Sequence, residues 1–100
     1  MSPKNYRISE IAIEDLDNIW IYTFKNYSVE QANRYYKLII DEIEFIAENF
    51  MSGKSMDYIK TGYRATRVKS HLIFYRKAED NKVEVIRVLH QMMDLENWLT

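Results

Sequence analysis

The sequence contains no cysteine, only one proline and only two glycines among its 100 residues. The absence of cysteine excludes disulfide bonds and thiolate-ligated zinc, and it suits a reducing compartment. Few prolines and glycines, together with 47% hydrophobic and 29% charged residues, exclude a disordered or low-complexity chain. This length and composition predict a single folded domain that spans residues 1–100.

Long apolar runs and clustered metal ligands are also missing. No apolar stretch reaches the roughly 18 residues that a membrane helix needs, and the start of the chain lacks the pattern of a secretory signal. We therefore expect a soluble, cytoplasmic protein with no membrane partner. The two histidines, His71 and His90, lie nineteen positions apart in no metal-binding motif, so we expect no metal ion and no cofactor.

Charge is unevenly distributed along the chain, although the formal net charge is only −1. Residues 1–59 carry 6 basic and 10 acidic side chains, whereas residues 60–90 carry 8 basic and 3 acidic ones. Such a basic segment can steer an acidic partner to one face of the protein. The alternative is that the excess of basic residues in this short segment arises by chance. With Tyr63, Phe74 and Tyr75 among its cations, the segment has the pattern of a surface that tracks phosphates and stacks bases, but the whole chain is slightly acidic. We expect no sequence-specific nucleic-acid binding, and a basic protein-docking face fits the segment at least as well.

The first quarter of the chain predicts a short strand followed by a helix. Tyr6 and Ile8 alternate with polar neighbours in "NYRIS" at residues 5–9, which is the pattern of a strand. Ser9 can then cap a helix whose first turn holds Glu10, a favourable charge near the positive end of the helix dipole. The apolar stripe expected to face the core consists of Ala12, Leu16, Ile19, Trp20, Thr23 and Tyr27.

A second helix is predicted to begin at "SVEQ", residues 28–31. Ser28 and Gln31 form a capping box, with Tyr27 and Ala32 placed as a hydrophobic staple, and Gly53 is expected to end the helix. The very short link between the helices predicts an antiparallel hairpin. The expected buried stripe consists of Ala32, Tyr36, Ile39, Ile43, Ile46, Ala47 and Phe50.

Some apolar residues of the two helices lie off these stripes. Leu38 and Phe45, seven positions apart, fall between the polar residues of the second helix, and Ile21 and Tyr22 are similarly placed on the first. Such residues are either half-buried by their neighbours or form a docking surface for a partner segment.

After residue 60 the period of the sequence changes to two, which predicts three strands over residues 62–68, 71–77 and 83–90. Their short links, one with the turn-forming Asp80 and Asn81, make neighbouring strands antiparallel. "MMDLENWL" at residues 92–99 is expected to close the chain as a short helix or an extended cap. The sequence therefore predicts an α+β fold of order β-α-α-β-β-β, in which a helical hairpin covers one face of a small antiparallel sheet.

Residues of the types used in acid–base ribonuclease chemistry occur on these strands, namely Tyr75, His71, His90, Arg64 and Arg87. Strand alternation places His71, Ile73 and Tyr75 on one face and Arg76 on the other, and it separates Arg64 from Arg67. On the last strand it places Val88 and His90 opposite Val85 and Arg87. Unless strand ends or bulges bring the others round, at most half of these side chains can therefore converge on one site, which weighs against an enzyme.

Four segments of the chain, in order, resemble the ParE toxins of bacterial toxin–antitoxin pairs, within the wider RelE/ParE superfamily. They are "YRISEIAIEDLDNIWIYT", "QANRYYKLIIDEIEFIAE", "GYRATRVKSHLIFYRK" and "VEVIRVLHQMMDLENWL". The resemblance runs over about residues 4–99, and the order of elements expected from the residues agrees with the fold of that family.

The resemblance implies a toxin that binds and inhibits DNA gyrase without being an enzyme, and a ParD-type antitoxin that wraps it in a hetero-oligomer. RelE-type relatives with this fold instead cleave mRNA on the ribosome, which is the alternative. The apolar and acidic end "QMMDLENWL" lacks the cationic or aromatic acid–base ending of such nucleases and favours a binder.

Two sets of candidate binding residues follow from the charge and helix patterns. The set expected to contact the target consists of Arg64, Arg67, His71, Arg76, Arg87, His90 and Met93. The set expected to contact the antitoxin consists of Trp20, Phe24, Tyr36, Leu38 and Phe45. We predict no catalytic and no metal-binding residues.

Overall fold

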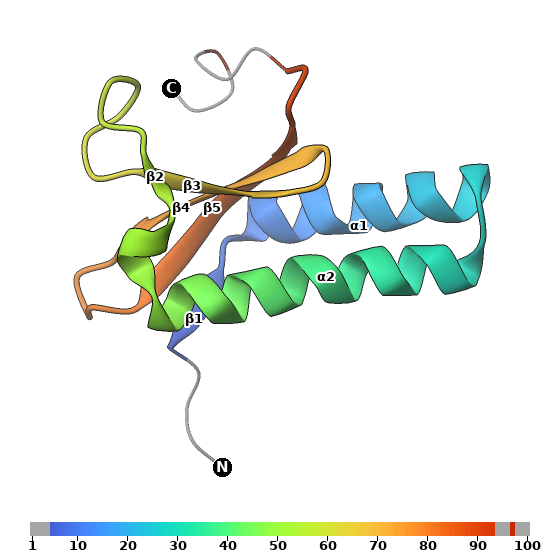
Figure 1. Cartoon of the computed structure of the whole chain (residues 1–100), viewed down its shortest axis with the longest axis horizontal. Coiled ribbons are helices and arrows are strands. Elements are labelled where there is room, and N and C mark those ends of the chain that lie inside the picture. The colour runs from blue at the N-terminus through green and yellow to red at the C-terminus, as the bar shows by residue number, and fades with distance from the viewer. Residues whose placement is uncertain (1–4, 94–96, 98–100) are drawn as a thin grey trace.

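The computed structural model describes residues 5–93 and 97. The chain runs through strand β1, two long helices, a short 3-10 helix and four further strands (Figure 1). Their bounds are β1 Tyr6–Ile8, α1 Glu10–Asn26, α2 Val29–Glu48, η1 Phe50–Ser52, β2 Lys54–Ser55, β3 Arg64–Val68, β4 His71–Lys77 and β5 Val83–His90. The expected cap over residues 92–99 falls mostly outside the described residues.

Both long helices begin where the sequence predicts. The Ser9 side chain accepts a hydrogen bond from the backbone N–H of Ala12 at 3.1 Å, and Ser28 accepts one from Gln31 at 3.0 Å. These bonds satisfy N–H groups that have no partner inside the first turn. The short link between the helices makes them antiparallel neighbours, as expected.

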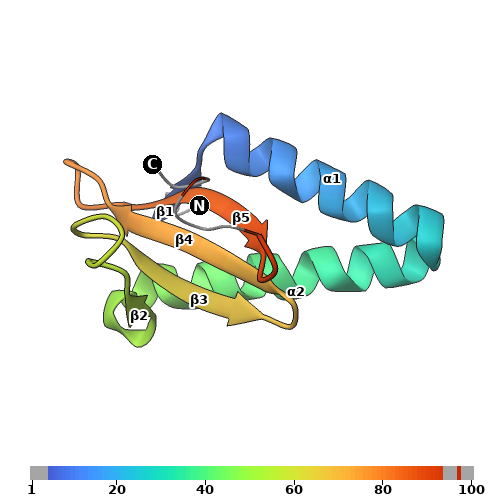
Figure 2. The ribbon, with the colours of Figure 1, turned by 90° about the horizontal axis from the view of Figure 1, so that it is seen from above.

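The five strands form one sheet in the order β1-β5-β4-β3-β2. Strands β2 to β5 pair antiparallel, whereas β1 pairs parallel with the start of β5, from Tyr6 opposite Val83 to Ile8 opposite Val85. The hairpin of α1 and α2 covers one face of this sheet (Figure 2). The predicted α+β class and element order are confirmed; the parallel β1 makes the sheet mixed, and β2 was not predicted.

A bulge in β5 changes the side-chain alternation expected for that strand. Phe74 lies opposite Arg87, but the next residue of β4, Tyr75, lies opposite Val85, so Ile86 is the extra residue. As a result Val85 and Val88 both pack in the cluster under the helices. The expectation that these two valines occupy opposite faces was therefore wrong. An inserted residue reverses the order in which the following side chains alternate between the two faces.

The sheet carries a hydrophobic cluster on each face. Under the helices, Ile73 and the two valines of β5 pack against Ala12, Leu16, Ile39 and Ile43. On the opposite face, Phe74 and Leu89 pack against Met56, Tyr63 and Ala65. The segment between β2 and β3 therefore covers part of the outer face of the sheet.

Several helix residues lie elsewhere than the sequence predicted. Tyr27 caps the C-terminus of α1 and is 65% exposed, and Tyr36 is 40% exposed, so neither belongs to a buried stripe. Helix α2 ends at Glu48, which leaves Phe50 in the 3-10 helix and Gly53 beyond it. Tyr35, rather than Tyr36, packs against the core.

The turn end of the hairpin extends past the sheet (Figures 1 and 2). Helix α2 has 20 residues and a length of about 30 Å, at 1.5 Å per residue. Strand β3, which lies beneath it, has 5 residues and a length of only about 17 Å. The hairpin therefore leaves part of its core-facing side uncovered. Within the described part of the chain, no helix is apolar enough over a sufficient length to cross a membrane.

Candidate partner-binding groove

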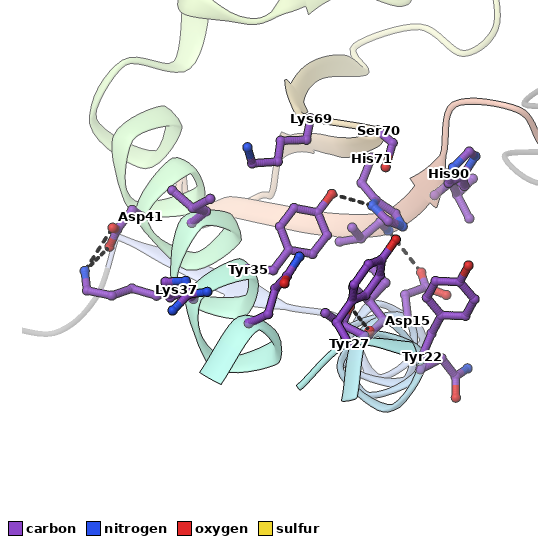
Figure 3. Close-up of a pocket in the computed structure, with 18 of the residues that line it drawn as sticks. Asp15, Tyr22, Tyr27, Tyr35, Lys37, Asp41, Lys69, Ser70, His71 and His90 are labelled. Atoms are coloured by element: carbon purple, nitrogen blue, oxygen red, sulfur yellow. Dashed lines mark hydrogen bonds and ion pairs between the residues drawn. The ribbon is translucent and has the colours of Figure 1, made fainter. Parts of the chain in front are cut away.

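A groove lies between the projecting end of the hairpin and the nearby end of the sheet (Figure 3). Tyr22 of α1, Tyr35 and Leu38 of α2, and the sheet residues His71 and His90 all line it. Met93, just after β5, also lines the groove and is 41% exposed. The lining combines aromatic and aliphatic side chains with many polar and charged groups.

Tyr35 links α2 to the end of the sheet. Its hydroxyl donates a hydrogen bond to the backbone oxygen of Val68 at 3.0 Å and lies 2.6 Å from Nδ1 of His71 (Figure 3). The sequence reading chose Tyr36 in its place, because the two adjacent tyrosines lie almost equally far from the centre of the helix stripe. Helical spacing does not separate them, since Tyr35 lies four residues and Tyr36 three residues before Ile39, and both spacings share one helix face.

The two histidines meet in this groove as direct partners on adjacent antiparallel strands. Their ring centroids lie 5.3 Å apart with the ring planes at 86°. Nδ1 of His90 accepts a hydrogen bond from the backbone N–H of Met92 at 3.1 Å. Burial, followed by the proximity of His90, lowers the pKa of His71 below its ordinary value.

A buried ion pair joins α1 to β5 at the edge of the groove. Asp15 accepts hydrogen bonds from Nε and Nη2 of Arg87 at 2.8 and 2.9 Å and from the backbone N–H of Val88 at 3.0 Å. The side chains of Arg87 and Asp15 are only 16% and 12% exposed. The hydrogen bond to Asp15 raises the pKa of Arg87. Asp15 therefore acts as a structural anchor that the sequence reading did not single out.

A family model described as "ParE toxin of type II toxin-antitoxin system, parDE" matches residues 6–95. The chain belongs to the ParE toxin family. It is 43% identical to "Toxin ParE1" of Caulobacter vibrioides and 36% identical to "Toxin ParE1" of Mycobacterium tuberculosis. Each match spans 91 residues, which is 91% of this chain and 93% of the relative.

The fold of this ParE-family chain also recurs in a solved structure, titled "Chromosomal ParDE TA system from P. aeruginosa". The two share a TM-score of 0.73 over 87% of this chain and 95% of the other, at 16% sequence identity. At this level of identity the comparison supports the fold alone.

The residues predicted to contact a target are dispersed in the ParE fold. His71, His90 and Met93 meet in the groove, whereas Arg67 is exposed on the opposite face of the sheet. The other three arginines already have partners inside the protein. Arg64 donates to the backbone oxygens of Met51 and Gly53, Arg76 pairs with Glu84 at 2.7 Å, and Arg87 pairs with Asp15.

The residues predicted to contact an antitoxin form two groups on the hairpin. Leu38 lines the groove and is 44% exposed, and Phe45, two turns further along the same side of α2, is 52% exposed. Trp20 stacks on Phe24 with ring centroids 5.4 Å apart and donates a hydrogen bond to Asn33 on α2 at 2.9 Å. Tyr36 lies outside the groove.

Tyr75 is the residue whose position weighs most against the ribonuclease alternative. It is fully buried, and its hydroxyl donates to the backbone oxygen of Phe50 at 2.8 Å and accepts from the N–H of Gly53 at 3.0 Å. Burial raises the pKa of its hydroxyl. A hydroxyl so placed supports the linker after α2 and does not face a substrate.

Proposed function

We propose that this ParE-family chain is the toxin of a type II toxin–antitoxin pair that inhibits DNA gyrase by direct, stoichiometric binding. The family match over residues 6–95, which contains all the elements from β1 to β5, is the observation that carries the proposal. In this proposal the chain acts in the cytoplasm, is not an enzyme and needs no cofactor. A ParD-type antitoxin neutralises it in a hetero-oligomer.

We place the antitoxin segment along the hairpin and in the groove. Supporting this, Leu38 and Phe45 are large apolar side chains on one side of α2 that the protein itself leaves about half exposed. Trp20, Phe24 and Tyr36 extend this contact over the hairpin. Burial of such side chains by a partner gives the apolar anchors that carry most binding energy at protein interfaces.

We assign target contacts to two regions of the sheet. The groove region contains His71, His90 and Met93, and the outer face carries Arg67. Arg64, which donates to backbone oxygens, adds positive charge to this surface, whereas the charges of Arg76 and Arg87 are balanced by Glu84 and Asp15. Because Leu38 and the two histidines line the same groove, an antitoxin bound there covers part of the target-binding surface, which is a direct means of neutralisation.

The proposed target is tested by titrating the purified protein into a DNA gyrase supercoiling assay on relaxed plasmid. Inhibition at amounts comparable to the enzyme is expected, since a binder must occupy each gyrase molecule. No effect at large excess, from a protein still toxic on expression, overturns the proposal and directs attention to ribosome-dependent mRNA cleavage. A nuclease acts at amounts far below those of its substrate.

The proposed antitoxin surface predicts the effect of introducing charge on α2. The double variant Leu38→Asp with Phe45→Asp is expected to bind the antitoxin encoded in the same operon at least tenfold more weakly. Each apolar anchor lost from such an interface costs roughly 1–2 kcal/mol. Calorimetry or surface plasmon resonance measures the change in Kd.

Ile21→Asp provides the matched control. Ile21 is 44% exposed, the same fraction as Leu38, but it lies on α1 outside the groove. Its replacement introduces the same chemistry and is expected to leave Kd within about twofold. Equal losses of affinity in both variants contradict the assigned surface.

A further inference from the structure

The fold brings two histidines together in the lining of the groove. His71 on β4 and His90 on β5 lie directly opposite one another, both partly buried. They are the only two histidines in the chain, and their rings lie edge to face. Any segment that fills the groove therefore covers both imidazoles.

Hydrogen bonds occupy Nδ1 of both rings. The Tyr35 hydroxyl donates its one proton to the Val68 oxygen, so its own oxygen accepts a hydrogen bond from Nδ1–H of His71, a bond that the neutral and the charged ring both make. Nδ1 of His90 accepts from the backbone N–H of Met92, so the proton of that ring lies on Nε2. Protonating His90 places a second N–H against that of Met92 and removes this hydrogen bond.

Among the described residues that line the groove, no carboxylate is left without a cationic partner. Among the described groove residues the only two carboxylates are already paired, Asp15 with Arg87 and Asp41 with Lys37. The cations Arg34 and Lys69 add positive charge to the same lining. The titratable and charged groups that line the groove or pair with its lining are Asp15, Tyr22, Tyr27, Arg34, Tyr35, Lys37, Asp41, Lys69 and Arg87.

We propose that His71 and His90 form a proton-sensitive contact that weakens binding of the antitoxin segment in the groove as the pH falls. The inference rests on the proposed function, because it assumes that this groove receives the antitoxin. A bound segment removes water from both rings, and removing water disfavours the charged form of an imidazole. Binding therefore releases protons, and its affinity decreases wherever the free protein carries them.

The test is a calorimetric titration of the full-length protein with the antitoxin encoded in the same operon, between pH 8 and pH 5.5 at constant ionic strength. Once the pH is below the pKa of a histidine in the free toxin, each further fall of one pH unit is expected to raise Kd by up to roughly tenfold. This factor applies to each ring that has to be neutral in the complex. The variant His71→Gln with His90→Gln keeps hydrogen-bonding side chains that do not titrate. The dependence of its Kd on pH reports the contribution of the antitoxin's own titratable groups. The difference between the wild-type profile and this profile is therefore due to the two histidines.

A second measurement follows the imidazole C–H signals by NMR in the free toxin and in the complex. The pKa of each histidine is expected to be lower in the complex. Parallel pH profiles for the wild type and the double variant, or stronger binding of the wild type at low pH, overturn the inference. Absence of binding at pH 8 in the wild type overturns the proposed antitoxin interaction itself, so the two failures are distinguishable.

Discussion

Replacing Asp15 with alanine is expected to lower the free energy of unfolding by about 3 kcal/mol, since it removes the carboxylate that pairs with the largely buried guanidinium of Arg87. The substitution removes two hydrogen bonds to Arg87 and one to the backbone of Val88, which together fix α1 to the last strand. Urea unfolding, followed by circular dichroism, measures the change.

Asp80→Ala is the control for the Asp15 prediction. Asp80 also pairs with an arginine, Arg7, at 2.7 Å, but these side chains are 49% and 46% exposed. Exposed pairs contribute roughly 0–1 kcal/mol, so a small effect is expected. Replacing both members of the buried pair, Asp15→Leu with Arg87→Met, is expected to restore most of the loss, because it leaves no unpaired charge. Similar costs for Asp15→Ala and Asp80→Ala contradict the anchoring role.

Gly53→Ala is expected to destabilise the protein by about 2–3 kcal/mol, because there is no space for a side chain at this position. A Cβ atom there lies 2.1 Å from the hydroxyl oxygen of Tyr75 and 2.9 Å from the backbone oxygen of Ala65. The backbone of Gly53 has φ −76°, which any residue adopts, so the cost arises from crowding and not from backbone strain. Thermal or urea unfolding measures it.

A double-mutant cycle with Tyr75→Phe separates this clash from other effects. Alone, Tyr75→Phe removes two buried hydrogen bonds and is expected to cost about 1–3 kcal/mol. In its background Gly53→Ala is expected to cost less, because the atom nearest to the new methyl group is gone. Gly62→Ala is the control, since a Cβ there meets nothing within 4 Å but φ is +86°. Its cost should not depend on Tyr75, and strictly additive costs for Gly53 and Tyr75 contradict the prediction.

The local elements of the fold could be predicted well from the sequence. The side chains of Ser9 and Ser28 cap the two helices, as expected, because capping depends on residues within one turn. Strands over 71–77 and 83–90 have the predicted bounds, because each alternates and is bordered by turn residues. The parallel pairing of β1 and the bulge at Ile86 depend on distant backbone contacts and have no local signature.

The candidate groove could be predicted only in part. Leu38 was recognised because it falls outside the apolar stripe of α2, and it does line the groove. The choice of Tyr36 over Tyr35 was wrong, because a helical wheel places two adjacent residues nearly symmetrically about the stripe. The contact that decides between them is made with Val68 and His71, more than thirty residues away in the chain.

The sequence by itself determined the element order, the helix starts and the family, because helix capping, hydrophobic periodicity and family motifs depend on residues that are close together in the chain. The tertiary structure alone decided which charged and polar residues are available for binding. It pairs Arg87 with Asp15, buries Tyr75 and brings His71 and His90 together at the end of the sheet. Charge pairing and burial depend on the register between strands and on the length by which the hairpin exceeds the sheet, and these are properties of packing between distant segments.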